Sequence, residues 1–317
     1  MKIVHISDLH LDGVHKRTNY WKSLKLLEFA SDNGFDHMII SGDITENAEK
    51  ESLDLARRLF KRFGLLKPDK FSLVIGNHDI FGGVHFAEDV LNFPKKCKTT
   101  DYDYKVNEFN SYFKETFEKT HNLQKRSYPF IKELDNAVLF GLNSIARYSV
   151  FKNPFASNGE IEPEQLADFE KIAGSEKYNN KIKIAVVHHH FCKNRLTIDT
   201  VSNSFWQKVE RQTMKLRSKK SIIKLFKKHN INLVLHGHLH ESAEYTRKGI
   251  KFLNAGGSIL GANSDELNLN YININSKEFK TRIQSIPFTP DSIPVKKNYF
   301  GLNDYTEIVH SGEINLN

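Results

Sequence analysis

Short apolar runs rich in β-branched residues recur along this chain, and each of them ends in a polar segment that contains Asp, His or Asn. Runs of this length, bounded by glycine and polar residues, predict buried β-strands. After the first two runs, apolar positions repeat at helical spacing, and Gly34 and Gly64 follow them as C-terminal helix signals. The pattern predicts alternating strands and helices with a parallel sheet. The five strands with polar ends occupy residues 2–6, 37–40, 71–75, 182–187 and 231–235.

Further elements are expected in the second half of the chain. Residues 137–142 predict a strand, and a helix is expected to start near Pro163, since proline suits a first helical turn. Residues 216–229 predict an amphipathic helix with lysines on its outer face. Closing strands are expected over residues 249–253 and 269–274. Together these elements predict an α/β protein.

Residues 81–135 do not alternate cleanly, and we expect an insertion there. It contains one apolar helical face, so it either overhangs the polar strand ends or packs on the edge of the sheets. We expect one large domain over residues 1–284 and an appended arm over residues 285–317. The helical face comprises Phe109, Tyr112, Phe113 and Phe117.

The polar strand ends have the composition of a metal site. In an extended backbone, residues i and i+2 point to the same side, so His238 and His240 can reach one point, as can Asp8 and His10. Because the carboxyl ends of parallel strands share one edge of a sheet, the polar segments are expected to lie together. Those segments read Ser7-Asp8-Leu9-His10, Ser41-Gly42-Asp43, Gly76-Asn77-His78-Asp79, His188-His189-His190 and His236-Gly237-His238-Leu239-His240.

The ordered set of these segments resembles the calcineurin-like metallophosphoesterase superfamily. The resemblance covers residues 8 to 240 and is nearest to the cyclic-nucleotide phosphodiesterase-like branch, because of the segments 141–144 and 159–166. The block typical of serine/threonine protein phosphatases is missing, since Ile44-Thr45-Glu46-Asn47 follows Asp43. The resemblance implies a four-layer α/β/β/α sandwich with two mixed sheets and a dinuclear metal site at the carboxyl edge of the strands.

The resemblance also implies roles for the polar residues. His78 is expected to be the catalytic histidine, with Asp79 either orienting it or serving as an acid at a helix N-terminus. Nitrogen and oxygen donors suit two divalent or trivalent transition-metal ions such as Mn, Fe or Zn. The implied ligands are Asp8, His10 and His240 for one metal, Asn77, His188 and His238 for the other, and Asp43 as the bridge between them.

The three consecutive histidines leave the ligand position open between two residues. If the strand ends at Val187, His188 takes the ligand position and His189 points toward substrate or solvent. A slip of one residue would make His189 the ligand, because neighbouring side chains in a strand point to opposite faces. We favour His188. Substrate contacts are expected from His189 and from loop residues that follow strands: Arg147, Tyr148, Lys193, Asn194 and Arg195.

Composition narrows the class of protein. With 39% hydrophobic and 26% charged residues, the 317-residue chain is typical of a soluble globular protein. Only Cys97 and Cys192 are present, too few for a disulfide framework, and no apolar run approaches the length of a membrane span. A cytoplasmic protein is therefore expected. The net charge of +8 favours anionic partners. Nucleic acid is one such partner, but the sequence does not favour it.

The expected function is metal-dependent hydrolysis of a P–O bond. The resemblance implies in-line attack by a metal-bridging hydroxide on a small phosphodiester such as a cyclic nucleotide. A DNA-repair-type nuclease and a phosphomonoesterase are the enzymatic alternatives. A non-catalytic scaffold would typically have lost ligands, and this chain keeps all the motif positions. The sequence carries no signal for an oligomeric state.

Overall fold

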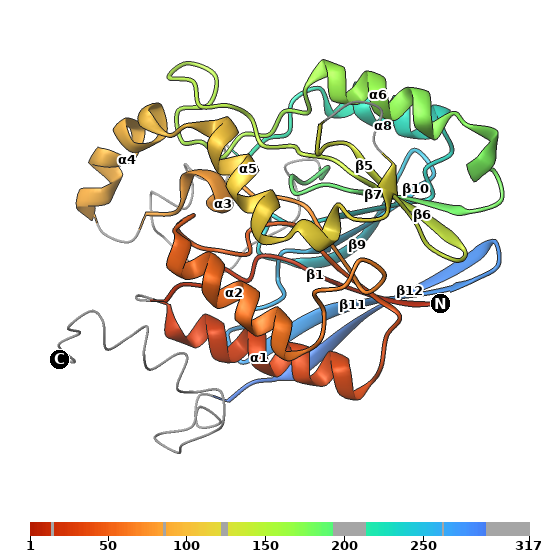
Figure 1. Ribbon diagram of the computed structural model, residues 1–317, viewed down its shortest axis with the longest axis horizontal. Coiled ribbons are helices and arrows are strands. Elements are labelled where there is room, and N and C mark those ends of the chain that lie inside the picture. Colours follow the sequence, from red (N-terminus) through yellow and green to blue (C-terminus); the bar gives the residue numbers. More distant parts are fainter. Residues whose placement is uncertain (14–15, 85–86, 122–125, 193–213, 262, 290–317) are drawn as a thin grey trace.

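Two β-sheets pack face to face, and helices cover the outer face of each (Figure 1). The computed structural model describes residues 1–13, 16–84, 87–121, 126–192, 214–261 and 263–289. Among the helices of this described part, none is long and apolar enough to cross a membrane. The helices and strands follow the order expected from the hydrophobic pattern, with additional strands at the sheet edges.

The first sheet has five strands in the order β12-β11-β1-β2-β3. Strands β1, β2 and β3 are parallel, whereas β11 is antiparallel to β1 and β12 is antiparallel to β11. The parallel strands are short and buried, as expected of runs that are apolar on both faces. The strands are β1 Lys2–Ile6, β2 His37–Ile40, β3 Phe71–Leu73, β11 Glu266–Asn275 and β12 Glu278–Pro287.

The second sheet has seven strands in the order β4-β5-β6-β7-β8-β10-β9. Strands β6, β7, β8 and β10 are parallel, and the outer pairs are antiparallel. Both sheets are therefore mixed, which confirms the predicted fold class. The strands are β4 Thr120–His121, β5 Phe130–Glu133, β6 Ala137–Gly141, β7 Ile182–Val186, β8 Leu233–His236, β9 Ser242–Arg247 and β10 Ile250–Ala255.

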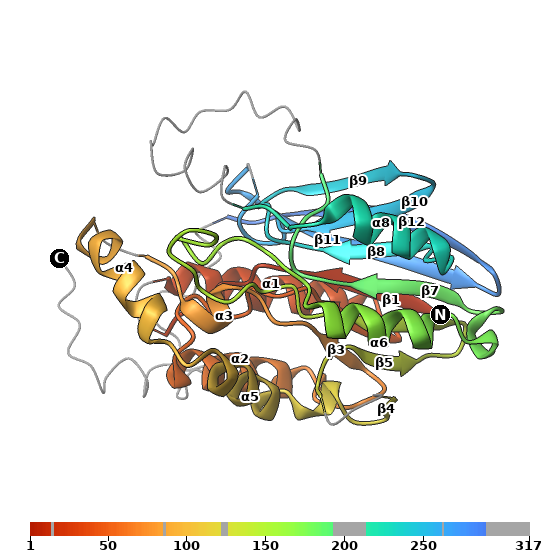
Figure 2. The same ribbon diagram turned by 90° about the horizontal axis from the view of Figure 1, so that it is seen from above.

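Helices of both outer layers bury one apolar face each. Figure 1 shows α1 and α2 on one side of the strands, and Figure 2 shows α6 and α8 beside each other on the other sheet. In α8, Ile222, Ile223 and Phe226 are buried and most of the lysines point outward. The helices are α1 Arg17–Asp32, α2 Lys50–Arg62, α3 His78–Phe81, α4 Ala87–Thr99, α5 Tyr102–Tyr112, α6 Pro163–Ala173 and α8 Lys219–Lys228, with 3-10 turns at Lys114–Thr116 and Glu176–Tyr178.

Alternation along β7 shows how the layers are held together. Ile182, Ile184 and Val186 belong to the apolar core that also contains residues of the first sheet, α1 and α2. Ala185 and Val187 belong to a second core with residues of α6 and α8. Because side chains of a strand alternate between faces, one sheet contributes to both cores. This gives the four layers that the resemblance implied.

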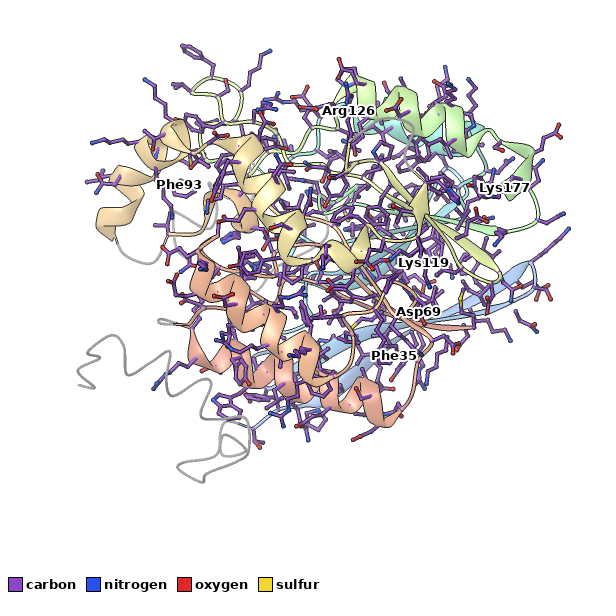
Figure 3. All side chains as sticks on the ribbon, viewed as in Figure 1. Phe35, Asp69, Phe93, Lys119, Arg126 and Lys177 are labelled. Atoms are coloured by element: carbon purple, nitrogen blue, oxygen red, sulfur yellow. The ribbon has the colours of Figure 1, made fainter. Side chains whose placement is uncertain are left out.

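The insertion expected over residues 81–135 contains α4, α5, a 3-10 turn, β4 and β5. Phe109 of α5 and Phe113, which follows this helix, are fully buried, and the ring of Phe113 lies 5.9 Å from that of Phe60 on α2. This half of the insertion therefore packs on the body of the protein. Figure 3 labels Phe93 on α4, at the end of the sandwich opposite to Phe35 and Asp69, which precede β2 and β3. Helix α4 thus lies toward the carboxyl ends of these strands.

Strand β12 crosses the domain boundary expected after residue 284. It remains paired with β11 up to Pro287, and Phe288 is buried against the core. Residues 290–317 of the expected arm lie outside the described residues. Strand β12 was not predicted from the sequence, because most of its side chains are polar and at least partly exposed, which is common at sheet edges.

Lys132 joins the insertion to the edge of the first sheet. Its side chain is buried in β5, and its ammonium group donates to the backbone oxygens of Pro68 at 2.8 Å and Phe71 at 2.9 Å. A third carbonyl, that of Glu115, lies at 3.4 Å. All three carbonyls would lose a partner if this side chain were removed.

Replacement Lys132→Ala is expected to lower the free energy of unfolding by about 2–4 kcal/mol, because buried carbonyls are left without donors. Urea unfolding of the full chain measures this. Lys61→Ala, at an exposed position of α2, is the matched control and should change stability by less than about 0.5 kcal/mol. Equal stability of the two variants would show that Lys132 has no structural role.

Candidate metal centre

The polar segments that follow β1, β2, β3, β7 and β8 meet at the carboxyl edge of the two sheets. Asp8, His10, Asp43 and His238 all have positive φ values, of 55°, 42°, 49° and 72°. Non-glycine residues rarely adopt this left-handed conformation, and its strain tends to occur at functional sites. The chain thus turns sharply after β1, β2 and β8, which directs the side chains toward one another.

Glycines allow the segments to approach closely. A Cβ atom on Gly237 would collide with Ser7 and the Asp8 carboxylate, and one on Gly76 would collide with Asp43. The backbone nitrogen of His238 donates to both oxygens of Asp8, at 3.0 and 3.2 Å. Close backbone approach of this kind is possible only without a side chain.

The protons on two buried histidines are placed by backbone carbonyls. Nδ1 of His188 donates to the Ser41 oxygen at 2.9 Å, and Nε2 of His238 donates to the Ser157 oxygen at 3.1 Å. A carbonyl can only accept, so these nitrogens carry the protons. Nε2 of His188 and Nδ1 of His238 remain for other partners, and these two atoms face each other at 3.1 Å.

Two side-chain oxygens, from Asp43 and Asn77, lie close to Nε2 of His188. Oδ2 of Asp43 lies 3.2 Å from Nε2 of His188, and Oδ1 of Asn77 lies 3.1 Å from it. Burial alone would lower the pKa of His188, yet the Asp43 carboxylate raises it to about 9. The position therefore favours positive charge. A metal ion can supply that charge while contacting Asp43, Asn77, His188 and His238 at once.

A second cluster shares Asp43 with the first. Nδ1 of His10 lies 2.7 Å from a carboxylate oxygen of Glu46, so Nε2 faces inward, where it is buried without a hydrogen-bond partner. This nitrogen lies 3.8 Å from Asp8 and 3.8 Å from Asp43, and Nε2 of His240 lies 3.7 Å from Asp8. Ligands of one ion are separated by roughly 3–3.7 Å when each bond is about 2.1 Å. Burial opposes protonation of His10, but Glu46 and Asp8 raise its pKa to about 10.

Glu46 is a site residue that the sequence analysis missed. Besides His10, its carboxylate contacts Lys16 at 2.6 Å, and it lies 3.8 Å from Nδ1 of His78. Burial would raise the pKa of Glu46, yet His78 and His10 hold it below its ordinary value. The only signal in the sequence is an acid three residues after Asp43, and such spacing is too common to be informative.

Asp79 binds backbone groups and does not orient His78, which was the first of the two roles that the sequence left open for it. The carboxylate of Asp79 accepts from the backbone of Thr45 at 2.8 Å, Gly76 at 2.9 Å and Ile44 at 3.3 Å. It therefore ties together the loops after β2 and β3. Burial and the nearby Asp43 raise the pKa of Asp79 to about 6. The imidazole of His78 instead donates from Nδ1 to the backbone oxygen of Glu46 at 3.1 Å, and it is 17% exposed.

The side chain of His189 is not exposed, although we expected it to point toward substrate or solvent. It is completely buried, and its two ring nitrogens contact the hydroxyl of Ser144 and the backbone oxygen of Ser157. His188, by contrast, lies in the polar cluster. The preceding strand β7 ends at Val186, one residue earlier than predicted.

The other expected substrate contacts have partners elsewhere in the protein or fall outside the described residues. Arg147 pairs with Asp103 at 2.6 and 3.0 Å, and its guanidinium lies over the ring of Tyr102 at 4.5 Å. It therefore holds its loop to α5. Tyr148 packs against the core. Residues Lys193, Asn194 and Arg195 fall outside the described part.

The chain belongs to the family of calcineurin-like phosphoesterases, whose pattern it matches over residues 1–242. No curated protein sequence matches it. The family implies a dinuclear metal centre, and the two clusters at the sheet edge offer suitable donors for one. The family comparison does not confirm the cyclic-nucleotide phosphodiesterase-like branch.

Solved structures with the same fold include two phosphatases and a nucleotidase. A dimetal phosphatase from Danio rerio superimposes with a TM-score of 0.54 at 10% identity, covering 91% of this chain and 99% of that one. A purple acid phosphatase from yellow lupin gives 0.52 at 12% identity, with 95% and 57% covered. A putative 5′-nucleotidase from Staphylococcus aureus gives 0.50 at 12% identity, with 98% and 58% covered. At these identities the similarity shows the fold alone.

We expect His188→Ala to bind one transition-metal ion fewer per chain than the unchanged protein, because the cluster around its Nε2 loses a central donor. Metal analysis after dialysis measures this. His121→Ala is the control, since His121 is 59% exposed on β4, and it should leave metal content unchanged. Unchanged metal content in His188→Ala would remove His188 from the set of ligands.

Proposed function

We propose that this protein hydrolyses phosphoesters with two metal ions held at the carboxyl edge of its sheets. The observation that carries the proposal is the meeting of buried imidazole and carboxylate donors beside the partly exposed His78. One metal would be held by Asp8, His10 and His240 and the other by Asn77, His188 and His238, with Asp43 between them. Manganese, iron and zinc all suit this mixture of nitrogen and oxygen donors.

The charges of the site favour an anionic substrate. Two divalent ions and the carboxylates of Asp8 and Asp43 leave a net charge of about +2 to attract a phosphoryl group. Bound metal ions of this kind lower the pKa of water, and thereby supply a nucleophile at neutral pH. Asn77 contributes an uncharged oxygen, so this positive balance is retained.

His78 would act on the leaving group. Its Nδ1 donates to the Glu46 backbone oxygen, which orients the ring and leaves Nε2 for the substrate. When the ring is protonated, Nε2 can donate its proton to the leaving oxygen as the P–O bond breaks. The backbone nitrogen of His78 also donates to Asp43 at 2.9 Å, which fixes the residue beside the metal cluster.

The proposed substrate is a small phosphodiester such as a cyclic nucleotide. Support comes from the segments 141–144 and 159–166, which resemble the phosphodiesterase branch, and from the missing protein-phosphatase block after Asp43. The phosphatases and nucleotidase with this fold make a phosphomonoester the main competing substrate. The two classes are separated by comparing turnover of bis(p-nitrophenyl) phosphate and p-nitrophenyl phosphate.

His78→Ala should lower kcat on the phosphodiester by about 10²–10⁴-fold, as loss of a general acid does. Metal content should remain at two ions per chain, because His78 is not a proposed ligand. A chelator should abolish turnover by the unchanged protein and added Mn²⁺ should restore it, while His121→Ala again serves as the control.

Turnover that resists the chelator, or two bound metals without hydrolysis of any phosphoester, would contradict the proposed function. Faster turnover of the monoester would overturn only the substrate assignment. Loss of both metals from His78→Ala would contradict the role given to His78.

A further inference from the structure

One backbone carbonyl lies against two neighbouring histidines of the site. The oxygen of Ser157 accepts from Nε2 of His238 at 3.1 Å and from Nε2 of His189 at 3.2 Å. The rings of these two histidines lie 4.4 Å apart. The position of this carbonyl therefore decides which nitrogen of His238 carries a proton, and which one faces His188.

His189 is held from its other side by Ser144. Because Nε2 of His189 donates to a carbonyl, Nδ1 of the neutral ring is an acceptor, and the hydroxyl of Ser144 lies 2.9 Å from it. The same hydroxyl oxygen accepts from the backbone nitrogen of His189 at 3.2 Å. Both ring nitrogens are thus used within the protein, and the side chain is fully buried. No atom of the imidazole remains to bind a substrate.

Hydrogen bonds join the two ends of the loop that carries Ser144 and Ser157. Gly159 pairs with Ile145 in an isolated β-bridge, and the nitrogen of Glu160 donates to the Ser144 oxygen at 2.9 Å. Within the loop, the buried side chain of Asn153 donates to the Ala146 oxygen at 3.2 Å. A Cβ atom on Gly159 would collide with the His189 ring. The loop and His189 are therefore fitted to each other.

We propose that His189 and Ser144 are positioning residues for the metal ligand His238. They hold the Ser157 carbonyl where it accepts the Nε2 proton of His238, so that Nδ1 points to the cluster formed with Asp43 and His188. Partners of this kind on metal-bound histidines fix ring orientation and proton position. The inference rests on the proposed function, because it assigns His238 as a metal ligand.

The test measures Mn²⁺ affinity of the full chain without substrate, and then kcat and KM at saturating metal. His189→Phe keeps an aromatic ring but cannot donate to Ser157, and one of the two metal affinities should fall about 10–100-fold while the other is unchanged. His189→Gln can place an amide donor near Nε2 and should restore most of the lost affinity. Ser144→Ala should weaken the same metal site to a smaller degree.

Ser149→Ala is the matched control, since Ser149 lies in the same loop and its hydroxyl accepts from the Lys152 backbone rather than from a histidine. It should leave both metal affinities unchanged. If His189→Phe does not fold, as judged by circular dichroism of the metal-free chain, Ser144→Ala and His189→Gln decide the question. Ser144→Ala must then weaken one metal site.

Unchanged metal affinity in His189→Phe, or a rise in KM at saturating metal, would overturn the proposal, because the second result marks a substrate contact. Absence of phosphoester hydrolysis by the unchanged protein would count against the proposed function alone, since the affinities are measured without substrate. The two failures are therefore distinguishable.

Discussion

Two buried imidazole nitrogens, Nε2 of His188 and Nδ1 of His238, face each other at the meeting point of the sheets. Asp43 and Asn77 add two oxygens to the same point. Bringing unshared electron pairs and a carboxylate together in a buried place is unfavourable unless positive charge lies among them. The raised pKa of His188, to about 9, has the same origin. The rest of the site can be understood as the means of holding these four groups together around a cation.

The fold supplies that restraint through its strand ends. Parallel strands from both sheets terminate at one edge, and residues such as Asp8 and Asp43 leave the strands in a left-handed conformation. The strain of these turns must be offset by neighbouring contacts. Asp79 provides several, because its carboxylate holds the backbones of the loops after β2 and β3 together. On the other side, the Ser157 carbonyl holds His238.

Much of this arrangement could be predicted from the sequence, for identifiable reasons. Buried parallel strands are recognised by short apolar runs, and their shared edge explains why Asp8, Asp43 and His238 come together although they are far apart in the chain. The polar edge strand β12 was missed, because it lacks the apolar alternation of a half-buried strand.

Side-chain partners past the strand ends were harder to predict. Nothing in the sequence indicated a role for Glu46. We expected Arg147 to contact substrate and His189 to face substrate or solvent. Each takes its partner from a segment distant in sequence: His10 for Glu46, Asp103 for Arg147 and Ser144 for His189. Periodicity describes which face of a strand a residue occupies, but it contains no information on a loop that folds back over that face.

Anomalous diffraction from crystals of the Mn²⁺-loaded protein would locate the metal ions and identify their ligands. We expect two ions roughly 3.5–4 Å apart, both in contact with Asp43. One ion should contact Nε2 of His188 and Nδ1 of His238, and the other should contact Nε2 of His10. A single ion held by Glu46 and His78, or coordination of His238 through Nε2, would contradict the proposed metal centre.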